Sequence, residues 1–270
     1  MILISHSLIY TTTFIFSYIS AYNAETHLWK ILYSIVLGWS VFGFTSIGHE
    51  LYHLDKLNII QKLIAFLYLD LWSVNKTTWV LRHNKWHHYN VYEEGEDEHM
   101  INGSLIKNYV HTITTLVKTY DLLQFSVTNY LLILFRILFF SQITWYCIFI
   151  TYTIIILCVT HFTFITHSAP VICECNNSCV KQLNRSVDIF PNSYLTLLIM
   201  GGFNLHSSHH CYPKCTRNEL QIVHNKLRDK YPDNLKVIET FHEFYNLYKY
   251  RDRQFENMNE WARHIKDDCK

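Results

Sequence analysis

The sequence predicts an all-α, polytopic membrane protein with about four transmembrane helices, interfacial helices and a cytoplasmic helical cap. Three observations lead to this fold class. Half of the 270 residues are hydrophobic and only 17% are charged, which is less charge than a soluble domain of this size usually carries. Long apolar stretches recur along the chain, and eight of its 17 histidines fall in three tight groups beside them.

The N-terminal part of the chain predicts two membrane spans and one interfacial helix. A helix needs about 20 apolar residues to cross a bilayer, and residues 8–22 and 29–48 approach or reach that length. Residues 57–74 are also apolar but contain Lys62 and Asp70, so we expect this segment to lie along the membrane surface. The first seven residues lack Lys and Arg, so a secretory signal is not expected.

The middle of the chain predicts a second helical hairpin. The apolar run over residues 130–160 is long enough for two helices, with a break at the polar residues 141–142. Arg136 is expected to extend toward that turn. Residues 217–270 are rich in charge and predict one or two solvated helices, interrupted at residues 231–233.

The distribution of basic residues orients this topology. Segments 49–121 and 168–270 hold 7 and 14 of the 23 Lys and Arg residues, so both are expected on the cytoplasmic side. The mean hydropathy is near zero, which leaves a soluble helical bundle as the alternative. The expected parts of this single domain are two spans (1–48), a cytoplasmic segment (49–121), the second hairpin (122–167) and a cytoplasmic C-terminal portion (168–270).

The three histidine groups are the candidate metal-binding residues of the sequence. Histidines three or four residues apart share one face of a helix, which suits a common metal ion. Eight imidazoles are too many for one zinc, so two metals are expected. Imidazole suits Zn, Cu, Fe or Ni, and a site at the ends of membrane helices would meet lipid-like chains, whose C–H bonds require an O2-activating metal. The groups read His49-Glu50-Leu51-Tyr52-His53, His83-Asn84-Lys85-Trp86-His87-His88 and His206-Ser207-Ser208-His209-His210.

The order and spacing of these boxes resemble the integral-membrane fatty acid desaturases and their hydroxylase relatives. The resemblance runs from about residue 28 to residue 215 and is nearest to the front-end acyl-lipid desaturases, although His206 stands where those enzymes have Gln. Boxes one and three are also similar to those of membrane alkane hydroxylases. Further matching residues are Trp79 before box two, and Gln182, Ser186-Val187-Asp188, Gly201-Gly202-Phe203-Asn204 and Pro213 around box three.

The resemblance implies two iron ions that use O2 and externally supplied electrons to remove hydrogen from an acyl chain. It also implies a ligand near the end of the last span, for which His161 is preferred and His167 is the competing choice. The polar residues expected to orient the ligating imidazoles are Glu50, Asp97, Asp188 and Asn204. The implied ligands are His49, His53, His83, His87, His88, His161, His206, His209 and His210.

The expected partners are an acyl-chain lipid, the surrounding membrane lipids and a separate electron donor. The sequence shows no flavin, haem or dinucleotide motif, so a cytochrome b5- or ferredoxin-type donor is expected; the basic segment 214–228 could bind it or anionic lipid headgroups. No nucleic-acid partner is expected. The endoplasmic reticulum membrane is the expected location in a eukaryote, with the site on the cytoplasmic face.

Three alternatives stay open at this point. A membrane hydroxylase of the same superfamily would use the same boxes. A zinc metalloprotease would use His49 and His53 with Glu50 as general base, and a metal-binding membrane protein would catalyse nothing.

The spacing of the cysteines does not predict a disulfide framework. Unpaired thiols are preferred over a structural zinc site for the cluster of Cys173, Cys175, Cys179, Cys211 and Cys215.

Overall fold

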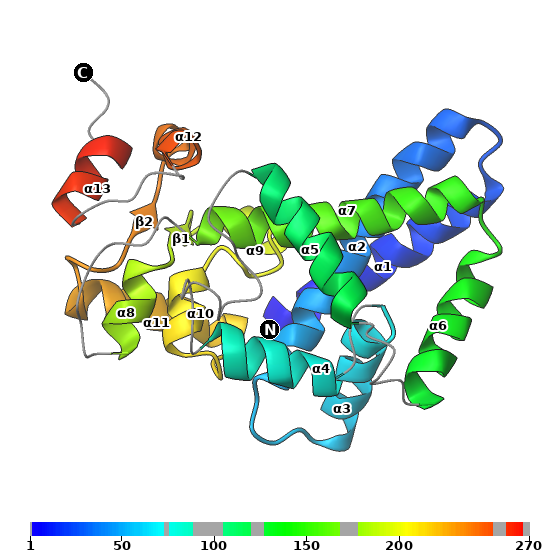
Figure 1. Cartoon of the computed structure of the whole chain (residues 1–270), viewed down its shortest axis with the longest axis horizontal. Helices are drawn as coiled ribbons and strands as arrows, with labels where there is room; N and C mark the ends of the chain where they lie inside the picture. The colour runs from blue at the N-terminus through cyan, green and yellow to red at the C-terminus, as the bar shows by residue number, and fades with distance from the viewer. Residues whose placement is uncertain are drawn as a thin grey trace. The chain divides into compact units, whose positions relative to one another are not determined.

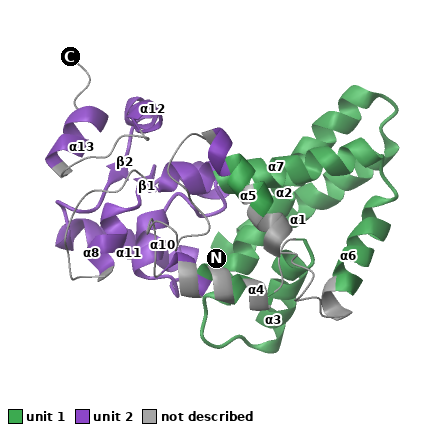
Figure 2. Cartoon of the chain, in the orientation of Figure 1, with its two compact units in different colours: residues 1–83, 109–160 green, residues 84–108, 161–270 purple. Residues whose placement is uncertain are grey.

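The structure, a computed structural model, describes residues 2–72, 76–88, 105–119, 127–167, 178–250 and 258–266. It is mostly helical and divides into two compact units, coloured separately in Figure 2. Unit 1 comprises residues 1–83 and 109–160, and unit 2 comprises residues 84–108 and 161–270. The helices (Figure 1) are α1 (Ile2–Asn23), α2 (His27–Tyr52), α3 (Ile59–Ala65), the π-helix η1 (Phe66–Asp70), α4 (Lys76–Trp79), the π-helix η2 (Val80–His87), α5 (Leu105–Thr119), α6 (Val127–Phe140), α7 (Trp145–Thr166), α8 (Ser178–Asn184), α9 (Tyr194–Ile199), α10 (His206–Cys211), α11 (Arg217–Lys230), α12 (Phe241–Tyr250) and α13 (Met258–Ile265).

Unit 1 is organised around α2, which packs against α1 and η1. The side chain of Thr26 caps the N-terminus of α2 by accepting a hydrogen bond from the backbone N–H of Trp29. Glycine allows the close approach of α1, because a Cβ atom at Gly43 would lie 2.3 Å from the ring of Tyr10. These contacts hold the C-terminal turn of α2, where box one lies, at a fixed place in the unit.

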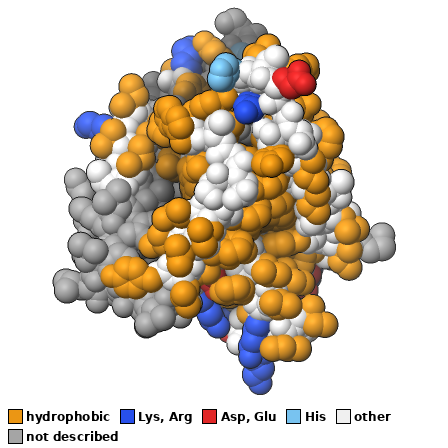
Figure 3. Space-filling view, turned by 90° about the vertical axis from the view of Figure 1, so that its right-hand side faces the viewer, with side chains coloured by type: hydrophobic (Ala, Val, Ile, Leu, Met, Phe, Trp, Pro, Cys, Tyr) orange, Lys and Arg blue, Asp and Glu red, His pale blue; other side chains and the backbone are white. Residues whose placement is uncertain are grey.

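Within the described residues, three helices are long and apolar enough to cross a membrane: α1, α2 and α7. The face drawn in Figure 3 is covered mainly by hydrophobic side chains, as expected for a surface in contact with lipid. These helices indicate an integral membrane protein. The predicted break at residues 141–142 is confirmed, but α6 is shorter than a span, so the described residues contain three membrane-length helices where about four were predicted.

The prediction for Arg136 is wrong. Its guanidinium donates hydrogen bonds to the backbone carbonyls of Leu71 and Asp70, at 2.6 and 2.7 Å, instead of extending toward the turn after α6. The carbonyls at the end of a helix have no intrahelical donor, and a cation satisfies them well. Arg136 therefore connects α6 to the end of η1. The η1 helix lies within residues 57–74, the segment predicted as an interfacial helix.

Unit 2 contains a two-stranded parallel sheet that the all-α prediction did not include. Strand β1 (Asp188–Ile189) pairs with β2 (Val237–Ile238), and Asp188 also bridges to Leu205, the residue before α10. Gly201 and Gly202 turn the chain toward that bridge with φ angles of 60° and 90°, a region that favours glycine. The bridge to Leu205 places Asp188 beside the N-terminus of the box-three helix.

The C-terminal helices surround this sheet. A capping box between Thr216 and Glu219 begins α11, which ends before Pro232, so the predicted break at residues 231–233 is confirmed. After β2 the described chain forms two further helices, α12 and α13, which pack against each other. Their apolar faces contribute Leu247, Trp261 and Ile265 to a buried core that also includes Ile189, Ile238 and the end of α7.

Candidate metal centre

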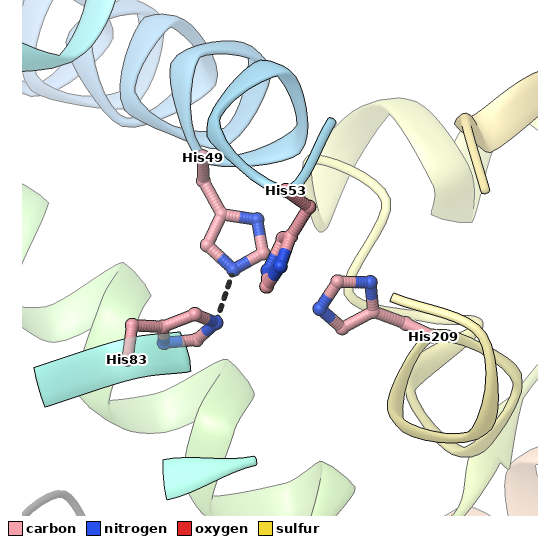
Figure 4. Close-up of side chains that lie close together, drawn as sticks. All are labelled: His49, His53, His83 and His209. Atoms are coloured by element: carbon pink, nitrogen blue, oxygen red, sulfur yellow. Dashed lines mark hydrogen bonds between the residues drawn. The ribbon is translucent and has the colours of Figure 1, made fainter. Parts of the chain in front are cut away.

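The first group of histidines lies in unit 1. His49 lies in the last turn of α2, His53 follows as its C-cap residue, and His83 lies on η2. The Nε2 atoms of His49 and His83 are 2.7 Å apart, and the ligating nitrogens of all three lie within 4.8 Å of one another. Figure 4 shows these three rings; the fourth ring drawn there, His209, belongs to unit 2. The expected pairing of His49 and His53 on one helix end is confirmed.

Trp79 forms an aromatic wall against this group. Its ring stacks on His83 with a centroid separation of 4.8 Å, and it meets His53 and His49 edge-on at 4.8 and 5.3 Å. The indole is buried, so it excludes water from one side of the three rings and restricts their rotation. The sequence marked Trp79 only through its place before box two.

The second group lies within unit 2 and consists of four buried histidines. His206 and His210 lie one turn apart on α10, His87 ends η2, and His167 follows α7. The Nε2 atom of His206 is 2.9 Å from that of His167 and 3.0 Å from that of His210. The ring of His87 lies 5.0 Å from that of His167 and 4.9 Å from that of His210, and the ligating nitrogens of all four lie within 4.8 Å.

The hydrogen-bond partners of Nδ1, the ring nitrogen that faces away from the other histidines, assign the tautomers of His167 and His210. Nδ1 of His167 faces the backbone carbonyl of Arg185 at 3.3 Å. Nδ1 of His210 faces Oε1 of Gln182 at 3.1 Å, while the amide of Gln182 donates to a backbone carbonyl at its other end. Both Nδ1 atoms must therefore donate, and in the neutral rings both Nε2 atoms carry a lone pair.

These two lone pairs meet the same atom, Nε2 of His206, which has at most one proton to donate. At least one pair of nitrogens therefore faces lone pair against lone pair, and a cation between them would remove that repulsion. Two nitrogens at right angles around a metal, with bonds of about 2.0–2.1 Å, lie about 3 Å apart. The separations of 2.9 and 3.0 Å match this geometry, so the residues fit a metal ion.

Burial keeps the imidazoles of α10 in the form that binds metal. Burial lowers the pKa of His206 and His210 well below the ordinary value, and neighbouring histidines lower it further. Burial likewise lowers the pKa of His209 to about 3. A metal binds the neutral imidazole, so protons would not compete with a metal for these nitrogens at neutral pH.

Box two does not have the predicted arrangement. The spacing of His83 and His87 predicts one shared face of an α-helix. Residues Val80–His87 form a π-helix instead, and the two rings belong to different histidine groups. His83 belongs to the first group and His87 to the second. His88, the next residue, lies with its ring 4.6 Å from that of His210 and 5.0 Å from that of His209.

Asp188 holds the N-terminus of α10. The residue before this helix, Leu205, provides no side-chain cap. Instead the buried carboxylate of Asp188 accepts hydrogen bonds from the backbone N–H groups of Ser207 and Ser208, at 2.8 and 3.3 Å, and from the hydroxyl of Ser208 at 2.6 Å. Its fourth donor is Nδ1 of His224 on α11, at 2.7 Å. Asp188 therefore positions the helix that carries His206, His209 and His210.

Gln182 connects boxes two and three within unit 2. Its side chain accepts from Nδ1 of His210 and donates to the backbone carbonyl of His88 at 2.6 Å. A partner that fixes the outer nitrogen of a ligating histidine orients the ring and sets its tautomer. The sequence marked Gln182 only by its likeness to the desaturase pattern, and it gave no signal for His224.

The structure places His167, and not His161, in the second group. The ring neighbours of His161 are Phe162 and Tyr248, at 6.1 and 6.2 Å. His161 lies within α7, whereas His167 lies just after its last residue, and only His167 belongs to the second group. His167, which follows the end of α7, is the one directed to α10.

The other polar residues expected at the site have different positions. Glu50 is buried on α2 between His49 and His53. Asn204 is fully buried and donates to the backbone carbonyl of Phe190, so it supports the loop that leads into α10. Asp97 lies outside the described residues.

Comparison with known proteins agrees with this site. The sequence profile of the family described as fatty acid desaturase matches residues 26–241, which is most of the chain and includes all three boxes. No curated protein matches the chain. The match places the His49-Glu50-Leu51-Tyr52-His53 pattern inside a desaturase sequence, where it is the first of three boxes. The described part of the chain has three membrane-length helices and two histidine groups able to hold metal ions. The chain is therefore a member of the fatty acid desaturase family and an oxidoreductase of the membrane.

Proposed function

We propose that the chain binds two iron ions and introduces a double bond into the acyl chain of a lipid or an acyl thioester. The observation that carries the metal assignment is the convergence of His167 and His210 on Nε2 of His206, with both outer nitrogens already committed as donors. The proposed ligands replace His161 by His167 and are His49, His53, His83, His87, His88, His167, His206, His209 and His210.

Iron, when bound, would supply the redox chemistry that couples reduction of O2 to removal of hydrogen from unactivated C–H groups. The overall reaction takes two hydrogens from the acyl chain, two electrons from a donor and two protons, and it yields two waters from O2. Gln182 keeps the Nε2 lone pair of His210 directed inward, and Asp188 keeps α10 in place. Among the described residues, both groups consist of imidazoles and contain no carboxylate of the kind that favours Mg²⁺ or Ca²⁺.

Metal analysis of matched variants tests the ligand set. We expect two irons per chain in the purified protein. His167→Ala should lose about half of the iron and nearly all activity, whereas His161→Ala, a control from the same helical segment, should keep both. One zinc and no iron in the wild-type protein would overturn the proposal, and loss of iron only in His161→Ala would overturn the choice of His167.

Product mass distinguishes desaturation from hydroxylation. Boxes one and three also resemble those of alkane hydroxylases, and this favours hydroxylation as the second candidate. The chain should be expressed in a host that lacks the activity, and the host lipids analysed by mass spectrometry. A loss of two mass units supports desaturation, and a gain of sixteen establishes hydroxylation instead.

A zinc protease predicts a different set of essential residues. In that enzyme Glu50 would be the general base, and the histidines of α10 would be dispensable. The diiron proposal requires His210, so His210→Ala should abolish the conversion of lipid. A variant His210→Ala with full activity, combined with an inactive Glu50→Gln, would favour the protease.

We further propose that the metal centre faces the cytoplasm, in the endoplasmic reticulum membrane if the organism is eukaryotic. The 21-to-2 division of basic residues supports this orientation. An acidic electron donor of the cytochrome b5 or ferredoxin type would bind the basic surface around α11, where Lys214 and Lys226 are exposed.

Charge reversal tests the donor surface. Lys214→Glu and Lys226→Glu together should raise KM for the donor about tenfold, with kcat unchanged, and the effect should diminish at high salt. An unchanged KM together with weaker binding to anionic vesicles would show that this surface contacts lipid headgroups instead.

A further inference from the structure

Two cysteines of unit 2 lie in contact directly beside the second histidine group. Cys179 lies on α8 and Cys211 is the last residue of α10, and their Sγ atoms are 2.7 Å apart. Sγ of Cys211 also lies 3.4 Å from the backbone carbonyl of Cys179. A disulfide has an S–S bond of about 2.05 Å, so a shift of well under 1 Å would bring these sulfurs to bonding distance.

The chemistry of Cys179 suits it to be the attacking thiol. The hydrogen bond with Cys211 lowers the pKa of Cys179, burial opposes this, and the positive charge of Lys230 lowers it further. Cys179 is partly exposed, so a small oxidant can reach it. By contrast, burial raises the pKa of Cys215, the other described thiol near α10. The Cys179 thiol is therefore more reactive than the Cys215 thiol.

We propose that Cys179 and Cys211 form a peroxide-sensitive dithiol that closes to a disulfide between α8 and α10. The oxidant is hydrogen peroxide. The Cys179 sulfur attacks one peroxide oxygen, the O–O bond breaks, and a sulfenic acid and one water form. The sulfur of Cys211 then displaces the hydroxyl group, which leaves with the Cys211 proton as a second water. Each sulfur loses one electron, and peroxide gains two.

The position of the pair gives the disulfide a consequence for the metal site. α8 carries Gln182, which fixes His210, and His210 immediately precedes Cys211 on α10. Closure would therefore connect the orienting helix to the ligand helix. Disulfides in reducing compartments are usually transient and redox-sensing, which fits a pair that lies beside a centre expected to handle O2. This inference does not depend on which metal binds there.

Mass spectrometry of the full-length, metal-loaded protein tests the proposal. After treatment with hydrogen peroxide and alkylation of remaining thiols, we expect a cross-linked peptide that contains both cysteines, with a mass two units below the sum of its reduced parts. Dithiothreitol should restore both thiols. Cys215→Ser should keep the cross-link, whereas Cys179→Ser and Cys211→Ser should each lose it.

Two results would overturn the proposal. One is the absence of the cross-link after peroxide treatment, seen as full alkylation of both cysteines or as Cys179 sulfinic acid. The other is resistance of both thiols to alkylation until a chelator removes a stoichiometric zinc ion. Both can be measured on the wild-type chain, so the test stands even if a serine variant does not fold.

Discussion

Replacement of Asp188 by Asn is the sharpest test of how the protein holds its box-three helix. The fully buried carboxylate accepts four hydrogen bonds, two from the first turn of α10, one from the Ser208 hydroxyl and one from His224. The Asn side chain has the same shape. Its single oxygen can still accept from the two backbone N–H groups, but its NH2 group then faces the Ser208 hydroxyl and His224.

The loss of stability of α10 in Asp188→Asn can be worked out from the hydrogen bonds that the substitution removes. Ser208 can rotate and accept a hydrogen bond, so the main loss is one bond between His224 and a charged acceptor, worth about 1.5–3 kcal/mol. Loss of the negative charge at the start of α10 adds about 0.3–1 kcal/mol. The variant should therefore destabilise α10 by about 2–4 kcal/mol, which corresponds to a factor of about 30–700 in an opening equilibrium.

Hydrogen exchange measured by mass spectrometry is the appropriate assay, because it reports on α10 separately from the rest of the chain. We expect the amides of α10 to exchange faster by this factor in Asp188→Asn, and the iron content to fall. Asp229→Asn makes the same chemical change at an exposed position of α11 and should alter neither. Unchanged exchange and full metal content in Asp188→Asn would refute a positioning role for Asp188.

Three further predictions concern packing, pH and ligand orientation. Gly43→Ala should destabilise unit 1 by about 1–3 kcal/mol, because its Cβ would lie 2.3 Å from the ring of Tyr10; an unchanged thermal midpoint in detergent would contradict the close packing of α1 on α2. Burial lowers the pKa of His209 from about 6.5 to about 3, so the unfolded chain binds more protons between these values and the metal-free protein loses stability as the pH falls through this window. At pH 5 this one group should cost about 2 kcal/mol relative to pH 7, and a denaturation midpoint that is equal at both pH values would count against it. Gln182→Leu should weaken metal binding about 10- to 100-fold by releasing Nδ1 of His210, and an unaltered affinity in a chelator competition would show that Gln182 has no part in orienting the ligand.

Local patterns in the sequence determined the chemistry and much of the helical structure. Spacings within a few residues fix which side chains share a helix face, so His49 and His53, like His206 and His210, could be paired without a structure. The apolar stretches predicted α1, α2 and α7 because the length needed to cross a bilayer is a property of the segment alone.

Tertiary structure decided which distant residues meet, since those contacts depend on packing that no short pattern encodes. His83 and His87 share one short π-helix but belong to different histidine groups, and His167 just after α7, instead of His161, lies beside α10. The bridge between Asp188 and Leu205 brings the Asp188 carboxylate to α10, nearly twenty positions away in the chain. The packing of α8 against α10 brings Gln182 to His210 and Cys179 to Cys211. The sequence therefore named eight of the nine proposed metal ligands, and the fold determined how these histidines are grouped and held.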